Sequence, residues 1–189
     1  ADMCQPGTPL IAETGGLNAM IVDSTALPEQ AVRDIITSAF QSAGQRCSAL
    51  RCLYIQRDIA PDLIKLLKGA MDELILGDPM SIQTDVGPVI TADAANKING
   101  YIENKRAKAS VLYEVEKPNH GNFVAPCMIQ VDGIQDLKEE IFGPVLHVAT
   151  FDARDLDTVV QKINETGYGL TFGLHTRIEN RVDAIAKQI

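Results

Sequence analysis

The chain has 189 residues, of which 46% are hydrophobic and 22% charged, and its formal net charge at pH 7 is −8. This length and composition are typical of one sizeable domain with a buried core. The acidic balance argues against a surface that binds nucleic acid or an anionic membrane. No apolar run approaches the roughly 20 residues that a membrane-spanning helix needs.

The cysteines and histidines do not form a metal-binding or disulfide pattern. No two of the four cysteines are spaced as C-x-x-C, and the three histidines lie far apart, so we expect no metal site. No signal peptide opens the chain, and a reducing, cytoplasmic compartment is the expected location. Cys52 and Cys127 lie in strand-like runs and are interpreted as core residues, whereas Cys4 has no assigned role.

Strand-like runs alternate with helical patterns along the chain. In chain order they predict a strand at 18–23, a helix at 28–42, a strand at 51–56, helices at 59–76 and 91–108, strands at 110–115 and 123–131, a helical segment at 134–140, a strand at 145–151, a helix at 155–166, a strand at 167–176 and a helix at 177–189. This order is typical of an α/β fold with a mostly parallel, open, twisted sheet and helices on both faces. Residues 1–9 are interpreted as a linker stump, and residues 10–189 as one domain.

The segment 38–50, which reads SAFQSAGQRCSAL, contains the first candidate site. Pro28 suits the first turn of the predicted helix, and Gly44 suits a position just past its end. Cys47 is therefore expected on a loop beside a rigid helix, with Arg46 next to it. Because a neighbouring cation lowers the pKa of a thiol, and the thiolate is the reactive form, Cys47 is a candidate nucleophile. A buried structural cysteine is the alternative.

Two glutamates lie in motifs with turn-forming neighbours. Glu13 belongs to AETGG, where the two glycines would let the backbone approach a ligand closely. Glu140 belongs to EEIFGP, in which two carboxylates precede an aromatic residue and a Gly-Pro turn. For each glutamate taken alone, an exposed loop or helix-end side chain is the alternative.

The three motifs together resemble the aldehyde dehydrogenase superfamily, in which AETGG, GQRCSA and EEIFGP occur in this order and at about these separations. The stretches AETGGLNAMIVDSTAL, LKGAM, DVGPVI and GYGLTFGLHTRI further resemble the dehydrogenase half of the bifunctional proline utilisation A proteins. Thr14 and Leu17 support this narrower resemblance, since most of the superfamily carries a leucine and a lysine there. In those proteins one domain oxidises proline with FAD. The other oxidises L-glutamate γ-semialdehyde, the open form of 1-pyrroline-5-carboxylate, to glutamate with NAD.

The resemblance implies a role for five residues. Cys47 would be the nucleophile, and Glu13 the general base that activates water for hydrolysis of a cysteine thioester. Glu140 would bind the hydroxyls of the nicotinamide ribose, and Phe142 would pack against the nicotinamide end. Ser48 would help to hold the carboxylate of the semialdehyde, although a serine at this position can also cap the following turn.

The resemblance also implies that the chain is the catalytic domain of a longer protein. The NAD-binding domain and an oxyanion-binding asparagine would precede Ala1, and a loop for the substrate carboxylate and an oligomerisation strand would follow Ile189. We therefore expect NAD as cofactor, a small aldehyde as substrate and a homo-oligomeric parent protein. FAD is expected only in a separate proline dehydrogenase domain of that parent.

Two other classes of function stay open at this point. The first is a cysteine-dependent hydrolase or acyltransferase that pairs Cys47 with a histidine. The second is a non-catalytic α/β module in which Cys47 is structural. A histidine within hydrogen-bond reach of Cys47 would favour the first, and a buried sulfur would favour the second.

Overall fold

The structure, a computed structural model, describes residue 5, residues 7–9 and residues 15–189. One six-stranded sheet has the order β3-β4-β5-β2-β1-β6. The strands are β1 (Ala19–Val22), β2 (Cys52–Gln56), β3 (Val111–Glu114), β4 (Cys127–Gln130), β5 (Val145–Phe151) and β6 (Phe172–His175). The helices are α1 (Pro28–Phe40), α2 (Ala60–Asp72), α3 (Ala92–Ala107), α4 (Leu156–Asn164) and α5 (Glu179–Ala186), with short 3-10 turns η1 (Gln41–Gly44), η2 (Ile134–Asp136) and η3 (Ala153–Asp155).

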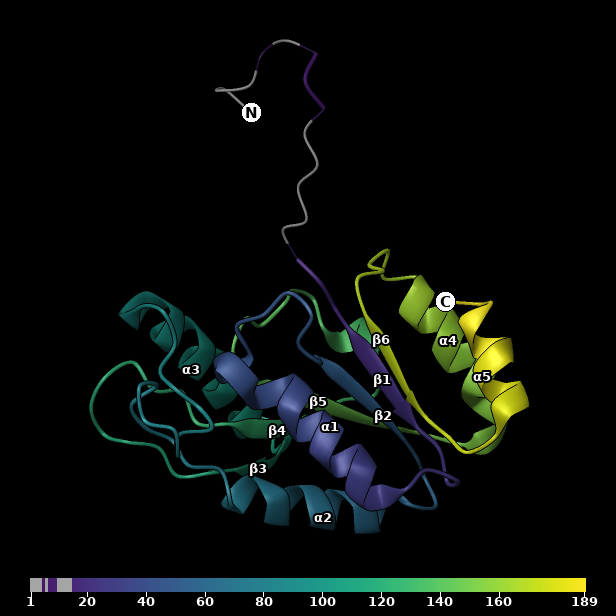
Figure 1. The fold of residues 1–189 in the computed structure, drawn as a ribbon, viewed down its shortest axis with the longest axis horizontal. Helices are drawn as coiled ribbons and strands as arrows, with labels where there is room; N and C mark the ends of the chain where they lie inside the picture. The colour runs from purple at the N-terminus through teal and green to yellow at the C-terminus, as the bar shows by residue number, and fades with distance from the viewer. Residues whose placement is uncertain (1–4, 6, 10–14) are drawn as a thin grey trace.

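All neighbouring strands pair in parallel except β3 and β4, which are antiparallel. The predicted α/β fold with a mostly parallel open sheet is therefore confirmed. The α1 connection runs from β1 to β2, and the α4 connection runs in the opposite direction, from β5 past β2 and β1 to β6. Because such crossovers are right-handed, α1 and α4 cover opposite faces of the sheet. Figure 1 shows α1 and α2 together over one side of the sheet, and α4 and α5 grouped beside β6.

Several predicted elements are shorter in the structure, and tertiary contacts explain the differences. The helix predicted at 59–76 ends at Asp72, after which Leu76 forms a bridge with Val86. The helix predicted at 134–140 is reduced to η2, because the chain beyond it extends and Glu140 engages distant partners. The strands predicted at 123–131 and 167–176 shorten to β4 and β6, and their outer residues form loops.

The central strands have apolar residues on both faces of the sheet. Every residue of β1 and of β2 is buried, which is the pattern of strands covered by helices on both sides. On the face opposite α1, the Tyr54 hydroxyl accepts a hydrogen bond of 2.7 Å from the Ile134 amide, which ties β2 to η2 beside α4. None of the described helices is long and apolar enough to cross a membrane.

The strand register brings four loops to one edge of the sheet. Ala19 at the start of β1 is the register partner of both Cys52, which begins β2, and Phe172, which begins β6. Cys52 is in turn the partner of His147 in β5. The chain segments that precede these four strands therefore meet at the amino edge of the parallel sheet. Open α/β sheets more often carry their ligands at the carboxyl edge.

His147 in β5 is a buried ring that is held neutral by its surroundings. Its Nδ1 lies 2.9 Å from the Arg51 carbonyl oxygen, and its Nε2 lies 2.8 Å from the Tyr101 hydroxyl. Since a carbonyl only accepts, Nδ1 carries the proton and Nε2 accepts from Tyr101. Burial is the main cause that lowers the pKa of His147 from 6.5 to about 4.

The protein is expected to lose stability as the pH falls from about 6.5 to about 4. In this range the unfolded chain takes up a proton at His147 that the folded chain does not, so protonation favours unfolding. The loss is about 3 kcal/mol at most, because each pH unit between the two pKa values contributes about 1.4 kcal/mol. Urea unfolding between pH 4 and pH 7 measures it, and the His147→Asn variant should show a flatter pH dependence. An unchanged dependence in the variant would assign the acid sensitivity to other groups.

Candidate functional site at the amino edge of the sheet

The loop of residues 45–50, which carries Cys47 and is called the cysteine loop below, follows an unusual helix end. Helix α1 stops at Phe40, and Ser42, Ala43 and Gly44 have positive φ angles of 56°, 52° and 65°. A Cβ at Gly44 would lie 2.1 Å from the Gly143 carbonyl oxygen, so this position accepts only glycine. The predicted turn at Gly44 is confirmed, although the regular helix ends four residues earlier. Cys47 follows on a loop, as predicted, and it is exposed, which rules out the alternative of a sulfur sealed in the core.

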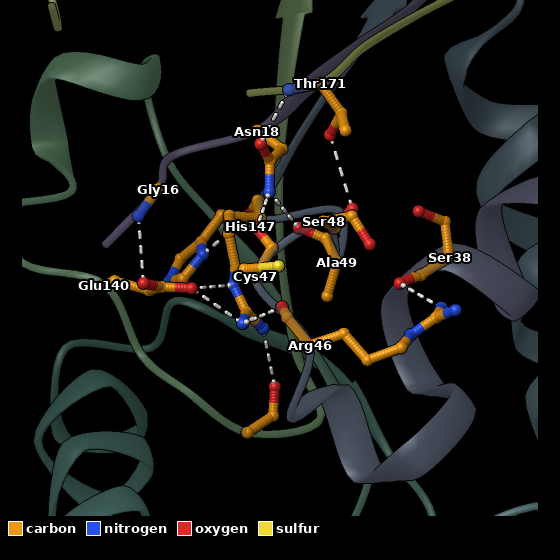
Figure 2. A network of polar contacts seen from close by, with 12 residues as sticks. Gly16, Asn18, Ser38, Arg46, Cys47, Ser48, Ala49, Glu140, His147 and Thr171 are labelled. Carbon is orange, nitrogen blue, oxygen red and sulfur yellow. Dashed lines mark hydrogen bonds and ion pairs between the residues drawn. The ribbon is translucent and has the colours of Figure 1, made fainter. Parts of the chain in front are cut away.

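Arg46 does not place its charge beside the thiol. Its Nη2 donates to the Thr37 carbonyl at 3.0 Å and to the Ser38 carbonyl at 3.5 Å, near the end of α1. Figure 2 shows the Arg46 side chain extending toward Ser38 and away from the sulfur of Cys47. The negative dipole end of the helix explains this orientation, since the guanidinium adds a charged donor to carbonyls that already accept from the Gln41 and Leu50 amides. The sequence pattern identified the neighbour in the chain but not its direction.

Arg51 is a buried cation that links the cysteine loop to the EEIFGP segment. Its Nε and Nη2 donate to Glu140 Oε1 at 3.0 and 2.8 Å, and the exposed fractions of the two side chains are 1% and 13%. Nη1 donates to the Gly143 carbonyl at 3.2 Å, and Nη2 also reaches the Arg46 carbonyl at 3.2 Å. Burial lowers the pKa of the Arg51 guanidinium, and the Glu140 carboxylate opposes this effect.

Glu13 lies outside the residues that the structure describes, so its position relative to Cys47 stays a prediction. The described part of the chain resumes at Gly15. The Gly16 amide donates to Glu140 Oε2 at 3.0 Å, and a Cβ at Gly16 would lie 3.4 Å from the Cys47 carbonyl oxygen. Gly16 therefore lies between the cysteine loop and the Glu140 carboxylate.

A cavity of about 390 Å³ opens beside Glu140, between α3 and the EEIFGP segment. Lys97 and Tyr101 line it from α3, and Glu140 and Phe142 line it from the other side. Phe142 is 45% exposed, and the Arg51 guanidinium carbon lies 5.3 Å from the centre of its ring. This arrangement offers a ligand a carboxylate that can accept hydroxyl donors and an uncovered aromatic face.

The other predicted residues are also placed. Ser48 is half-buried in the loop, and its carbonyl accepts a 3.3 Å hydrogen bond from the Thr171 hydroxyl. Cys52 and Cys127 are buried, as predicted, and burial raises the pKa of both thiols. Over the described part of the chain, no three His, Cys, Asp or Glu side chains form a group that could hold a metal ion.

No histidine among the described residues is hydrogen-bonded to Cys47. His147 lies at the same edge of the sheet, as the register partner of Cys52. Both of its ring nitrogens are already hydrogen-bonded, to the Arg51 carbonyl and the Tyr101 hydroxyl. His175 ends β6 at the carboxyl edge of the sheet, where its Nε2 lies 3.6 Å from an Asp34 oxygen. The described geometry thus provides no Cys-His pair of the kind that a cysteine hydrolase needs.

Three residues that build this edge, namely Asn18, Arg51 and Thr171, were not predicted from the sequence. Asn18 donates from its side-chain nitrogen to the carbonyls of Cys47 and Ala49 at 2.7 and 2.9 Å. A polar residue directly before an apolar strand was the available signal, since such positions border the loops. This signal is weak, because a polar residue at the start of a predicted strand is common and does not single out Asn18 or Arg51.

Comparisons with known proteins identify the class. The aldehyde dehydrogenase family matches residues 1–189, so the chain belongs to the aldehyde dehydrogenase family, as the motifs indicated. The bifunctional protein PutA of Klebsiella aerogenes is 50% identical over 183 residues, which cover 93% of this chain and 14% of that protein. The 1-pyrroline-5-carboxylate dehydrogenase of Geobacillus kaustophilus is 37% identical over 171 residues, which cover 89% of this chain and 33% of that protein.

Solved structures agree with this assignment. A crystal structure of a bifunctional proline utilization A (PutA) protein superposes with a TM-score of 0.93 at 46% identity, covering 98% of this chain and 19% of that one. Betaine aldehyde dehydrogenase from Staphylococcus aureus, solved in complex with NAD+, gives a TM-score of 0.84 at 26% identity, covering 93% and 36%. The chain therefore spans a minor part of the relatives and structures that it matches.

Replacing Arg51 by methionine is expected to destabilise the protein by about 3 kcal/mol. The variant leaves the Glu140 carboxylate, which is 13% exposed, without its cationic partner. Urea unfolding at pH 7 measures the loss. Arg57→Ala is the matched control, since Arg57 and Asp152 form an ion pair whose side chains are 61% and 40% exposed, and its loss should cost under about 1 kcal/mol. Equal losses in the two variants would contradict the role given to the buried pair.

Proposed function

We propose that this chain is the catalytic domain of an NAD-dependent aldehyde dehydrogenase that oxidises L-glutamate γ-semialdehyde to L-glutamate in proline catabolism. The observation that carries the proposal is the exposed Cys47 thiol on a loop fixed next to the Glu140 carboxylate and the Gly15-Gly16 segment. The name of the 1-pyrroline-5-carboxylate dehydrogenase relative supports the substrate, and the name proline utilization A supports the link to proline catabolism. The NAD+ complex of the betaine aldehyde dehydrogenase supports the cofactor.

The chemistry begins at Cys47. Its thiolate adds to the electrophilic aldehyde carbon, which gives a thiohemiacetal whose oxygen carries the developing charge. NAD, when bound, would accept the hydride that the thiohemiacetal oxyanion expels from its carbon, and this loss of hydride leaves the thioester. Glu13 then removes a proton from water, which attacks the thioester carbonyl and releases the carboxylic acid with regeneration of the thiol.

The residues around the cavity fit a nicotinamide ribose. Each Glu140 oxygen accepts hydrogen bonds from Arg51 or Gly16 and keeps acceptor capacity for a further donor. The exposed ring of Phe142 offers an apolar contact for the nicotinamide end. Ser48, next to the nucleophile in the same loop, is proposed to bind the carboxylate of the semialdehyde.

The wider setting is part of the proposal. The domain would belong to a longer cytoplasmic homo-oligomer whose NAD-binding domain lies outside these 189 residues. A separate FAD-dependent proline dehydrogenase domain, which the motif resemblance implies, would supply the substrate, and the word bifunctional in the names of the PutA relatives is consistent with such a second domain. The acidic surface and the described helices offer no support for a nucleic-acid or membrane partner through this domain.

Cys47→Ser in the complete enzyme should abolish oxidation of the semialdehyde, by at least about 10³-fold, because an alcohol of ordinary pKa is a far weaker nucleophile than a thiolate. NADH formation followed at 340 nm measures the loss. Proline oxidation by the same variant, followed with a dye acceptor, is the internal control and should be unchanged. Semialdehyde oxidation that survives in the variant would reject Cys47 as the nucleophile.

Glu13→Gln tests the general base separately. The glutamine keeps the shape but cannot take a proton, so thioester formation should proceed while its hydrolysis slows by about 10²- to 10⁴-fold. Stopped-flow measurement should show a burst of about one NADH per active site, followed by a slow steady rate. Glu29→Gln, an exposed change in the first turn of α1, is the control and should behave as wild type. A variant without a burst would place Glu13 before the thioester, or outside the reaction.

A further inference from the structure

The backbone of the cysteine loop is held by side chains from outside it. Four successive carbonyls, those of Arg46, Cys47, Ser48 and Ala49, each accept a side-chain hydrogen bond. The donors are Arg51 Nη2 at 3.2 Å, Asn18 Nδ2 at 2.7 Å, the Thr171 hydroxyl at 3.3 Å and again Asn18 Nδ2 at 2.9 Å. Asn18 alone therefore fixes the carbonyls on both sides of Ser48.

Asn18 is itself fixed in orientation. Its side chain is buried, with the residue 4% exposed, and its Oδ1 accepts a 3.2 Å hydrogen bond from the Thr171 amide. Reversing the side-chain amide would set an oxygen against two carbonyls and a nitrogen against an N–H, so the contacts define one orientation. The Asn18 main-chain carbonyl also accepts from the amides of Arg51 and Cys52 at 2.9 and 3.1 Å.

The fixed carbonyls determine where the amides of the loop point. In a trans peptide the C=O and the following N–H point in opposite directions, so the Cys47 and Ser48 amides turn away from Arg51 and Asn18. Among the described residues, neither amide donates a main-chain or side-chain hydrogen bond. Amides held in this way can stabilise an oxyanion that forms on a group attached to the neighbouring sulfur.

We propose that Asn18 is a positioning residue for the Cys47 nucleophile, assisted by the Thr171 hydroxyl and acting through the backbone of the cysteine loop. Asn18 contacts the Cys47 carbonyl and not the thiol, so its effect falls on the geometry of the loop (Figure 2). The inference rests on the proposed function for the identity of the nucleophile. The placement of the loop by Asn18 does not depend on the substrate.

Gln56, the last residue of β2 at the carboxyl edge of the sheet, provides a matched control for Asn18. It is also a buried amide, 8% exposed, and it accepts from the Ser24 amide at 3.3 Å and donates to Asp58 at 2.9 Å. Replacing either amide by leucine leaves buried polar partners without a hydrogen bond, which costs stability in both variants. Because Gln56 makes its hydrogen bonds to Ser24 and Asp58, only the Asn18 change is expected to alter the cysteine loop.

The test compares Asn18→Leu with Gln56→Leu in the complete enzyme, with semialdehyde and NAD as substrates. Asn18→Leu should lower kcat by about 10- to 100-fold, as small misplacements of reacting groups do, with the KM for each substrate within about twofold. Gln56→Leu should keep kcat within about twofold despite a similar fall in melting temperature. A kcat loss in Asn18→Leu no larger than in Gln56→Leu, or a change confined to KM, would overturn the proposal.

Thr171→Val keeps the test decisive if Asn18→Leu does not fold. Valine has nearly the same shape and leaves the Thr171 amide in place, but it removes the hydrogen bond to the Ser48 carbonyl. The variant should lose at least about twofold in kcat, in the same direction as Asn18→Leu. Its melting temperature should change little, because Thr171 is exposed and water can replace the lost donor. An unchanged kcat in this variant would overturn the proposal.

Hydrogen exchange separates this proposal from the proposed function. The Ala49 and Leu50 amides donate to the Arg46 and Ser38 carbonyls at 3.1 and 3.2 Å, so their exchange reports the order of the loop. Exchange of both should be several-fold faster in Asn18→Leu than in wild type or in Gln56→Leu. Faster exchange in an enzyme that does not oxidise the semialdehyde would reject the function and keep the positioning role. Unchanged exchange, with activity still dependent on Cys47, would reject the positioning role alone.

Discussion

The buried ion pair between Arg51 and Glu140 is the interaction on which the rest of the site depends. A guanidinium that is 1% exposed needs a charged partner and further acceptors, and this one finds them in Glu140 and in the Gly143 and Arg46 carbonyls. Glu140 also accepts from the Gly16 amide. Its side chain therefore joins three segments of the chain: its own, the one that contains Gly16 and the one that contains Arg51. The buried Arg51 side chain thus helps to fix the geometry of the cysteine loop.

The parallel sheet explains why these segments meet. Strands β1, β2, β5 and β6 lie side by side, so the loops that precede them gather at one edge. The left-handed turn from Ser42 to Gly44 brings the end of α1 back to this edge, with Gly44 pressed against Gly143. Loops carry reactive groups on a rigid scaffold in many folds, and here the scaffold also supplies the side chains that orient the loop. The exposed thiol therefore sits on a backbone with little freedom.

The amide of Asn18 and the guanidinium of Arg51 act on the same stretch in complementary ways. Both donate hydrogen bonds to carbonyls of the cysteine loop, so the N–H groups of Cys47 and Ser48 point to the opposite side of the peptide planes. Buried polar groups of this kind are expensive to leave unpaired, so the fold tolerates few alternatives at these positions. Stability and site geometry are coupled at this edge of the sheet.

The sequence by itself determined the fold class, the family and the position of Cys47 on a loop, whereas the exposure of its thiol was decided by the tertiary structure. Apolar periodicity, the glycine at the helix end and the spacing of three motifs are local or ordered along the chain, so they can be read without coordinates. Only the tertiary structure decided the direction of the Arg46 side chain and the extended path of the chain up to Glu140. It also decided the hydrogen-bonding roles of Asn18 and Arg51. The Gly16–Glu140 contact joins residues 124 positions apart, and the Arg51–Glu140 pair joins residues 89 apart. Such contacts depend on strand order and register, which no local pattern encodes.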